Sequence, residues 1–93
     1  MSVTFYIPSY LRNFTGGYDR VELNSAPATV GQALEALWAL HPCVQDRLVT
    51  ERGELRQHIN VFVGDENIRF TGGLETRLTD GAEVTIIPAV SGG

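Results

Sequence analysis

The chain ends in the stretch Leu78-Thr-Asp-Gly-Ala-Glu-Val-Thr-Ile-Ile-Pro-Ala-Val-Ser-Gly-Gly93, which contains its clearest structural pattern. The Asp80-Gly81 pair predicts a turn, and the apolar run from Glu83 to Ile87 predicts a strand after it. Because this run is the most apolar strand pattern of the chain, we expect it at the centre of a sheet. The last residues show no core-forming pattern. The sequence therefore predicts a domain over residues 1–87 and a projecting tail over residues 88–93.

Upstream of this stretch, the hydrophobic spacing changes between the period of a strand and that of a helix. Residues 2–7 and 19–23 alternate apolar with polar side chains, which predicts a hairpin with a long loop. Thr29 and Gln32 form a capping-box pattern, and the apolar residues after them recur at helical spacing. Pro42 ends this helix and suits the first turn of a short second helix.

The second half of the chain is again extended. Residues 59–63 alternate toward a turn at 64–67, residues 68–70 predict a short strand, and residues 74–78 predict a single helical turn. This order of elements predicts a two-layer α+β fold of the β-grasp type, with one main helix across one face of a mixed sheet of four to five strands. In that topology the first and last strands pair in parallel. The predicted core residues are Leu34, Leu37, Val61, Val84 and Ile86.

Composition excludes several classes of function. The 93 residues are 43% hydrophobic and 19% charged, as in a single globular domain, and no apolar stretch is long enough to span a bilayer. The net charge is -4 and the basic residues are scattered singly, which argues against a nucleic-acid partner. The single cysteine, Cys43, and a beginning without a signal-peptide pattern lead us to expect a cytoplasmic protein.

All seven basic residues are arginines. A chain without lysine offers no side-chain amine for an isopeptide bond. A general compositional bias explains this absence as well as a selected chemistry does, and the sequence leaves both explanations open.

The predicted tail is the strongest functional candidate. Gly92 and Gly93 have no Cβ atoms, so the terminal carboxylate can enter a narrow channel of a partner and be approached closely there. We expect Val90, Ser91 and Gly92 to form the projecting arm and the Gly93 carboxylate to be the reactive group. A frayed glycine-rich terminus is the alternative explanation.

The whole sequence, and most strongly the stretch from Leu78 to Gly93, resembles the ubiquitin-like family of molybdopterin-synthase small subunits and thiamine sulfur carriers. Within this family, Thr15-Gly-Gly17 and Asn67-Ile-Arg-Phe-Thr-Gly-Gly-Leu74 are most similar to the carrier of a cysteine-synthesis branch. The resemblance implies that an E1-like adenylyltransferase and sulfurtransferase joins the Gly93 carboxylate to AMP, because an ionised carboxylate resists nucleophilic attack. Sulfide or a persulfide then displaces AMP and leaves a thiocarboxylate that serves as sulfur donor.

The resemblance also implies the other molecules involved. We expect no cofactor on the carrier itself, and we expect it to be a protein cosubstrate of the activating and sulfur-transfer enzymes and not an enzyme. ATP and Mg²⁺ belong to the activating enzyme, and pyridoxal phosphate belongs to the sulfur-accepting synthase of the cysteine branch, whose product a peptidase releases. Alternative roles are the small subunit of molybdopterin synthase or a carrier of another thiolation pathway, a ubiquitin-like protein modifier conjugated through Gly93, and a noncatalytic adaptor domain.

No side chain is predicted to be catalytic. Cys43 lies close to His41, but no nucleophile motif surrounds them, so we expect a buried or half-buried structural thiol. His41 and His58 have no partners at ligand spacing, which predicts no metal site. The glycine pairs at 16–17 and 72–73 lack the lysine of a phosphate loop and predict turns.

Tyr6 and Ile87 are the predicted partner-binding residues. If Phe5 and Ile86 face the helix, strand alternation turns Tyr6 and Ile87 to the opposite face of the sheet. On neighbouring strands they would lie together beside the tail, where apolar side chains can anchor a partner. Scattered exposed apolar residues are the alternative explanation.

Overall fold

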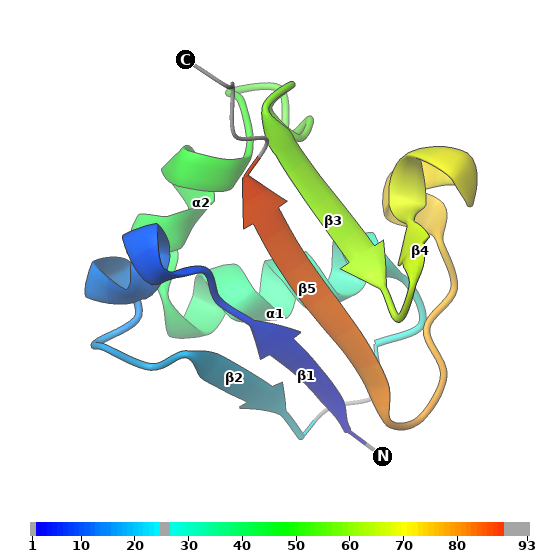
Figure 1. Cartoon of the computed structure of the whole chain (residues 1–93), viewed down its shortest axis with the longest axis horizontal. Helices are drawn as coiled ribbons and strands as arrows, with labels where there is room; N and C mark the ends of the chain where they lie inside the picture. The colour runs from blue at the N-terminus through cyan, green and yellow to red at the C-terminus, as the bar shows by residue number, and fades with distance from the viewer. Residues whose placement is uncertain (1, 25–26, 89–93) are drawn as a thin grey trace.

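The computed structural model describes residues 2–24 and 27–88, which form a five-stranded sheet with helices packed on one of its faces (Figure 1). The strands are β1 (Val3–Tyr6), β2 (Arg20–Leu23), β3 (Ile59–Val63), β4 (Glu66–Asn67) and β5 (Ala82–Pro88). The helices are α1 (Val30–Leu40) and α2 (Pro42–Leu48), with short 3-10 helices η1 (Ser9–Phe14), η2 (Ile68–Phe70) and η3 (Gly73–Glu75). The predicted two-layer α+β fold with one main helix is confirmed.

The sheet has the strand order β2-β1-β5-β3-β4, so β5 is central as predicted. β1 and β5 pair in parallel, and the other pairs are antiparallel. In the register, Tyr6 lies opposite Thr85, and Ile59 lies opposite Pro88. The last residues of β5 are therefore held beside the end of β1 and the beginning of β3.

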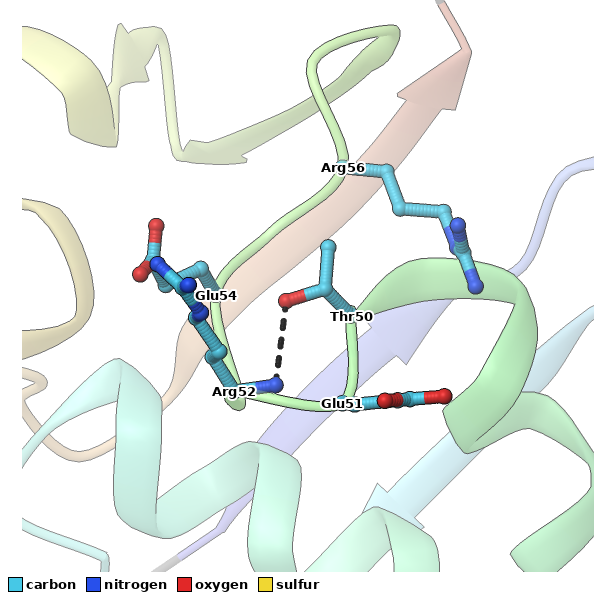
Figure 2. A pocket seen from close by; sticks show the side chains of 5 residues that line it. All are labelled: Thr50, Glu51, Arg52, Glu54 and Arg56. Carbon is cyan, nitrogen blue, oxygen red and sulfur yellow. Dashed lines mark hydrogen bonds between the residues drawn. The ribbon is translucent and has the colours of Figure 1, made fainter.

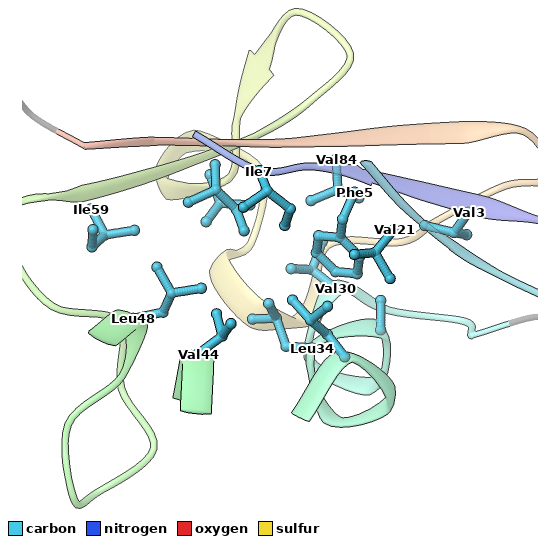
Figure 3. Close-up of a cluster of buried hydrophobic side chains, with 14 of the residues drawn as sticks. Val3, Phe5, Ile7, Val21, Val30, Leu34, Val44, Leu48, Ile59 and Val84 are labelled. Carbon is cyan, nitrogen blue, oxygen red and sulfur yellow. The ribbon is translucent and has the colours of Figure 1, made fainter. Parts of the chain in front are cut away.

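The core lies between the sheet and the two α-helices (Figure 3). Strand and helix periodicities put their apolar residues into this layer, and all five predicted core residues are buried: Leu34, Leu37, Val61, Val84 and Ile86. The start of α1 follows the predicted cap, because the Thr29 hydroxyl accepts a 3.2 Å hydrogen bond from the Gln32 N–H. The Gln32 side chain bonds back to the N–H of Ala28 at 2.8 Å.

Two local predictions are corrected. Residues 68–70 are the 3-10 helix η2 and not a strand, because the Asn67 side chain accepts a 3.0 Å bond from the Arg69 N–H and turns the chain. The short strand β4 lies just before it, inside the predicted turn. The predicted helical turn at 74–78 is the shorter η3, which ends where the Thr76 hydroxyl donates to the Gly73 carbonyl at 2.7 Å.

Candidate functional site: the open sheet face and the tail exit

One register row crosses all five strands on the sheet face opposite the helices. Its residues, from β2 to β4, are Arg20, Tyr6, Thr85, Phe62 and Asn67. Their strand neighbours Phe5, Val61 and Val84 are buried on the helix side, so the row faces away from the core. We call this surface the open face.

Tyr6 lies on the open face, as predicted, and its hydroxyl donates a 2.7 Å hydrogen bond to the Glu83 carboxylate. This hydrogen bond to an anion raises the pKa of Tyr6, and a small desolvation effect acts in the same direction. Glu83 lies two residues before Thr85 on β5, whereas Ile87 lies two residues after it. Tyr6 and Ile87 therefore share the face as diagonal neighbours on adjacent strands, but the tyrosine hydroxyl reaches toward Glu83 and away from Ile87.

The open face has two further aromatic residues that sequence reasoning missed. Phe62 is half-buried in the row described above, and Phe70 on η2 is 86% exposed. Both line a shallow hollow of about 410 Å³ together with Asn67. Phe62 could have been found from the sequence, because strand alternation turns it to the face opposite the predicted core residue Val61. Phe70 was hidden because its segment was predicted as a strand.

The tail begins where β5 ends at Pro88. Ile87, the last residue before it, is 43% exposed and lies opposite Asn60 on the open face. The predicted arm and reactive group, Val90, Ser91, Gly92 and Gly93, lie outside the described residues. The structure therefore places the exit of the tail, and the role of Gly93 stays a prediction.

The cysteine prediction is corrected. Cys43 is exposed, because the buried side of the short helix α2 is occupied by Val44 and Leu48. Among residues 2–24 and 27–88, no cluster of histidine, cysteine and acidic side chains is arranged to hold a metal ion. In the same residues, no helix is both long and apolar enough to cross a membrane.

A polar surface depression of about 500 Å³ lies in the loop after α2 (Figure 2). Its side chains do not converge: Arg52 and Glu54 lie on one side of the loop and Arg56 on the other. The Thr50 hydroxyl accepts a 3.3 Å hydrogen bond from the Arg52 N–H, which is a contact within the loop. This arrangement serves the loop's own structure and has no built substrate site.

A mixed five-stranded sheet with a parallel pair at its centre and one main helix across one face defines a ubiquitin-like β-grasp protein. The model of the ThiS family matches residues 6–93 of the chain. The sulfur carrier protein CysO of Mycobacterium tuberculosis is 41% identical over 95 aligned positions that cover 100% of both chains. The chain belongs to the ThiS family of ubiquitin-like sulfur carriers, as the resemblance predicted. It is a sulfur carrier protein, which is a cosubstrate and not an enzyme.

Two solved structures extend the comparison. A chain in the crystal structure of the Amycolatopsis orientalis BexX/CysO complex is similar with a TM-score of 0.88 and 45% identity, covering 98% of this chain and 99% of that one. The crystal structure of SAMP1 from Haloferax volcanii is similar with a TM-score of 0.83 and 33% identity, covering 100% of both chains. The fold of the described residues is thus shared with proteins named as a sulfur carrier and as an archaeal modifier.

Proposed function

We propose that this sulfur carrier works in cysteine biosynthesis and delivers its sulfur as a thiocarboxylate on Gly93. The observation that supports this pathway best is the similarity to CysO over the complete length of both chains. The stretch from Asn67 to Leu74, which resembles the cysteine-synthesis carrier, forms the end of β4 and the helices η2 and η3 beside the open face.

The chemistry takes place on the main-chain carboxylate. A Gly93 oxygen attacks the α-phosphorus of Mg-ATP on the activating enzyme, and pyrophosphate leaves. Sulfide then attacks the carbonyl carbon of the acyl adenylate, the C–O bond to AMP breaks, and a thiocarboxylate results. The carrier positions this carboxylate. The five residues beyond Pro88 span at most ~17 Å, so the C-terminus can reach the reaction centre of the partner while the domain docks on its surface.

We infer two classes of partner, an E1-like adenylyltransferase and sulfurtransferase and a sulfur-accepting synthase. The complex of the similar CysO chain with BexX supports such enzyme partners. Ile87 at the tail exit, and the exposed apolar groups farther from it on the same face, support docking through the open face. Tyr6 and Ile87 are its predicted contacts, and we add Phe62 and Phe70 because they lie on the same face.

Intact-mass analysis tests this function. The chain is incubated with the host activating enzyme, Mg-ATP and sulfide, and then with the sulfur-accepting synthase. We expect one terminal oxygen to be replaced by sulfur in the first step, and a covalent product on the carrier once the synthase and its amino-acid substrate are added. The native mass should return only when the releasing peptidase is added. A carrier that gains sulfur but transfers none to the cysteine-forming synthase would overturn the proposed pathway.

A second candidate function is protein modification through Gly93. Small archaeal modifier protein 1 of Haloferax volcanii is 41% identical over 66 residues, which are 71% of each chain. The same incubation with added lysine-containing proteins separates the two functions, because a modifier appears as a covalent adduct on its target.

A further inference from the structure

Carboxylates gather at the end of the sheet where β5 begins. The five that lie there are Glu22, Asp65, Glu66, Asp80 and Glu83. Thr4 lies between two of them in the register, and the Gly64 N–H of the β3–β4 turn donates to the Glu83 carbonyl at 3.0 Å. Asp80 accepts a 2.9 Å bond from the Ser2 N–H at the same end. Most of the net negative charge therefore lies away from the tail.

Arginines gather at the opposite end, around the point where β5 finishes. Arg69 donates from Nη2 to the carbonyls of Gln57 at 2.7 Å and Ile59 at 3.3 Å, and Ile59 lies opposite Pro88. Arg12 donates from Nε to the Ile7 carbonyl at 3.3 Å, just beyond the end of β1.

Two more arginines line a hollow of about 370 Å³ next to the start of β3, together with Tyr10, Asp46 and His58. Arg56 donates from Nε and Nη2 to the Asp46 carbonyl at 3.0 and 2.8 Å. Arg47 stacks its guanidinium 4.6 Å from the centre of the Phe14 ring. We call Arg12, Arg47, Arg56 and Arg69 the tail-exit arginines.

The groups that hold these four arginines in place are uncharged, so they do not neutralise the guanidinium charges. Carbonyl oxygens and an aromatic ring hold them, so each keeps its charge and free N–H groups for another acceptor. The nearby carboxylates are those of Asp19, Asp46, Glu51 and Glu54. They face five guanidinium groups, because Arg52 lines the same depression as Arg56. The two ends of the sheet thus have opposite excess charge.

We propose that the tail-exit arginines dock the carrier onto an acidic surface around the tail-binding channel of its activating enzyme. This proposal rests on the proposed function and names the chemistry of its partner surface. A chain of net charge -4 is repelled overall by such a surface, and the repulsion is weakest in the orientation that presents this end. Complementary charges therefore make the tail approach first and speed association. Planar guanidinium groups also match carboxylates in bidentate pairs.

The absence of lysine fits the same site. A lysine near the tail exit would lie within the ~17 Å span of the tail and could attack the acyl adenylate, forming an amide and releasing AMP and a proton. Arginine supplies the positive charge and stays protonated, so it does not compete with the sulfur donor.

Charge reversal tests the docking. Arg47→Glu and Arg77→Glu change the net charge equally, but Arg77 pairs with Thr29 far from the tail exit. Association with the host activating enzyme is measured without ATP at increasing salt. We expect Arg47→Glu to slow association roughly 3- to 10-fold at low salt, with the difference vanishing at high salt as screening shortens the range of the charges. Arg77→Glu and the charge-conserving Arg47→Lys should leave the rate near that of the native chain.

Equal effects of Arg47→Glu and Arg77→Glu, or association of the native chain that does not depend on salt, would overturn the docking proposal. Thermal unfolding of each variant establishes that it is folded. Thiocarboxylate formation at saturating carrier is measured in parallel. If thiocarboxylate forms normally but the association rate does not depend on the arginines, only the docking surface is rejected. If association depends on salt and on Arg47 but no thiocarboxylate forms, only the proposed function is rejected.

Discussion

At the scale of single residues, the contact between Tyr6 and Glu83 fixes a side chain of the open face. Its hydroxyl donates to the carboxylate, so deprotonation breaks a hydrogen bond and puts two negative charges together. The pKa of Tyr6 is raised for this reason. Because the folded pKa lies above the unfolded value, the stabilisation is present at neutral pH and is lost as the pH rises through the folded pKa.

We expect Glu83→Gln to lower the pKa of Tyr6 toward its ordinary value. A tyrosinate absorbance titration in a chain with Tyr10→Phe and Tyr18→Phe measures this residue alone. The same titration without the Glu83 change is the control. An unchanged midpoint would show that the carboxylate does not set the pKa.

A second residue-scale prediction concerns the lysine-free surface. With Mg-ATP and activating enzyme but no sulfur donor, Arg47→Lys should form an internal amide between Lys and Gly93, because its amine lies near the tail exit. Intact mass would show a product lighter by one water. Arg77→Lys, at the other end of the sheet, is the matched control and should keep its mass when dilute. Equal self-acylation of both variants would show that the distance of the lysine from the tail exit does not control the reaction.

At the scale of elements, helix α1 supplies a direct test of the packing. Leu37 is fully buried and Leu40, three residues later, is 57% exposed. We expect Leu37→Ala to lower the free energy of unfolding by ~2 to 5 kcal/mol, because it leaves a cavity between helix and sheet. Leu40→Ala should change it by about 0.5 kcal/mol or less. Urea denaturation measures both, and similar losses for the two would contradict the described helix face.

The elements also show how much the sequence could predict. Strand and helix periods were enough for the core and for the central place of β5, because long-range packing obeys the same alternation. They failed at η2, where one hydrogen bond from the Arg69 N–H to the Asn67 side chain overrides a local strand pattern. The contact of Tyr6 with Glu83 was also out of reach, because only the register reveals which outward residues meet.

Substitutions on the open face test whether the activating enzyme docks there. Ile87→Ala and Phe70→Ala each remove an exposed apolar group, so we expect a raised KM for the carrier in activation with little change in stability. Tyr18→Ala is the control, since Tyr18 is 64% exposed outside the open face. Activation kinetics of the three variants measure the effect. If the double variant Ile87→Ala, Phe70→Ala behaves like the control, another surface docks the partner.

At the scale of the whole molecule, the proposed function gives the fold and the charge distribution one task, which is to present the Gly93 carboxylate to a partner. β5 is the central strand and pairs in parallel with β1, so both strands finish at the same end of the sheet. The tail-exit arginines lie at this end. In the proposed function, the described side chains dock the partner and the terminal carboxylate undergoes the chemistry.

The most direct test of the account is the intact mass of the chain after incubation with activating enzyme, Mg-ATP and sulfide, with and without Gly92 and Gly93. Glycine has no side chain to bury, so the chain without its last two residues should unfold at nearly the same denaturant concentration. We expect the full chain to exchange one oxygen for sulfur and the shortened chain to keep its mass. A shortened chain that still gains sulfur, or a full chain that gains none, would contradict the assignment of Gly93 as the reactive group.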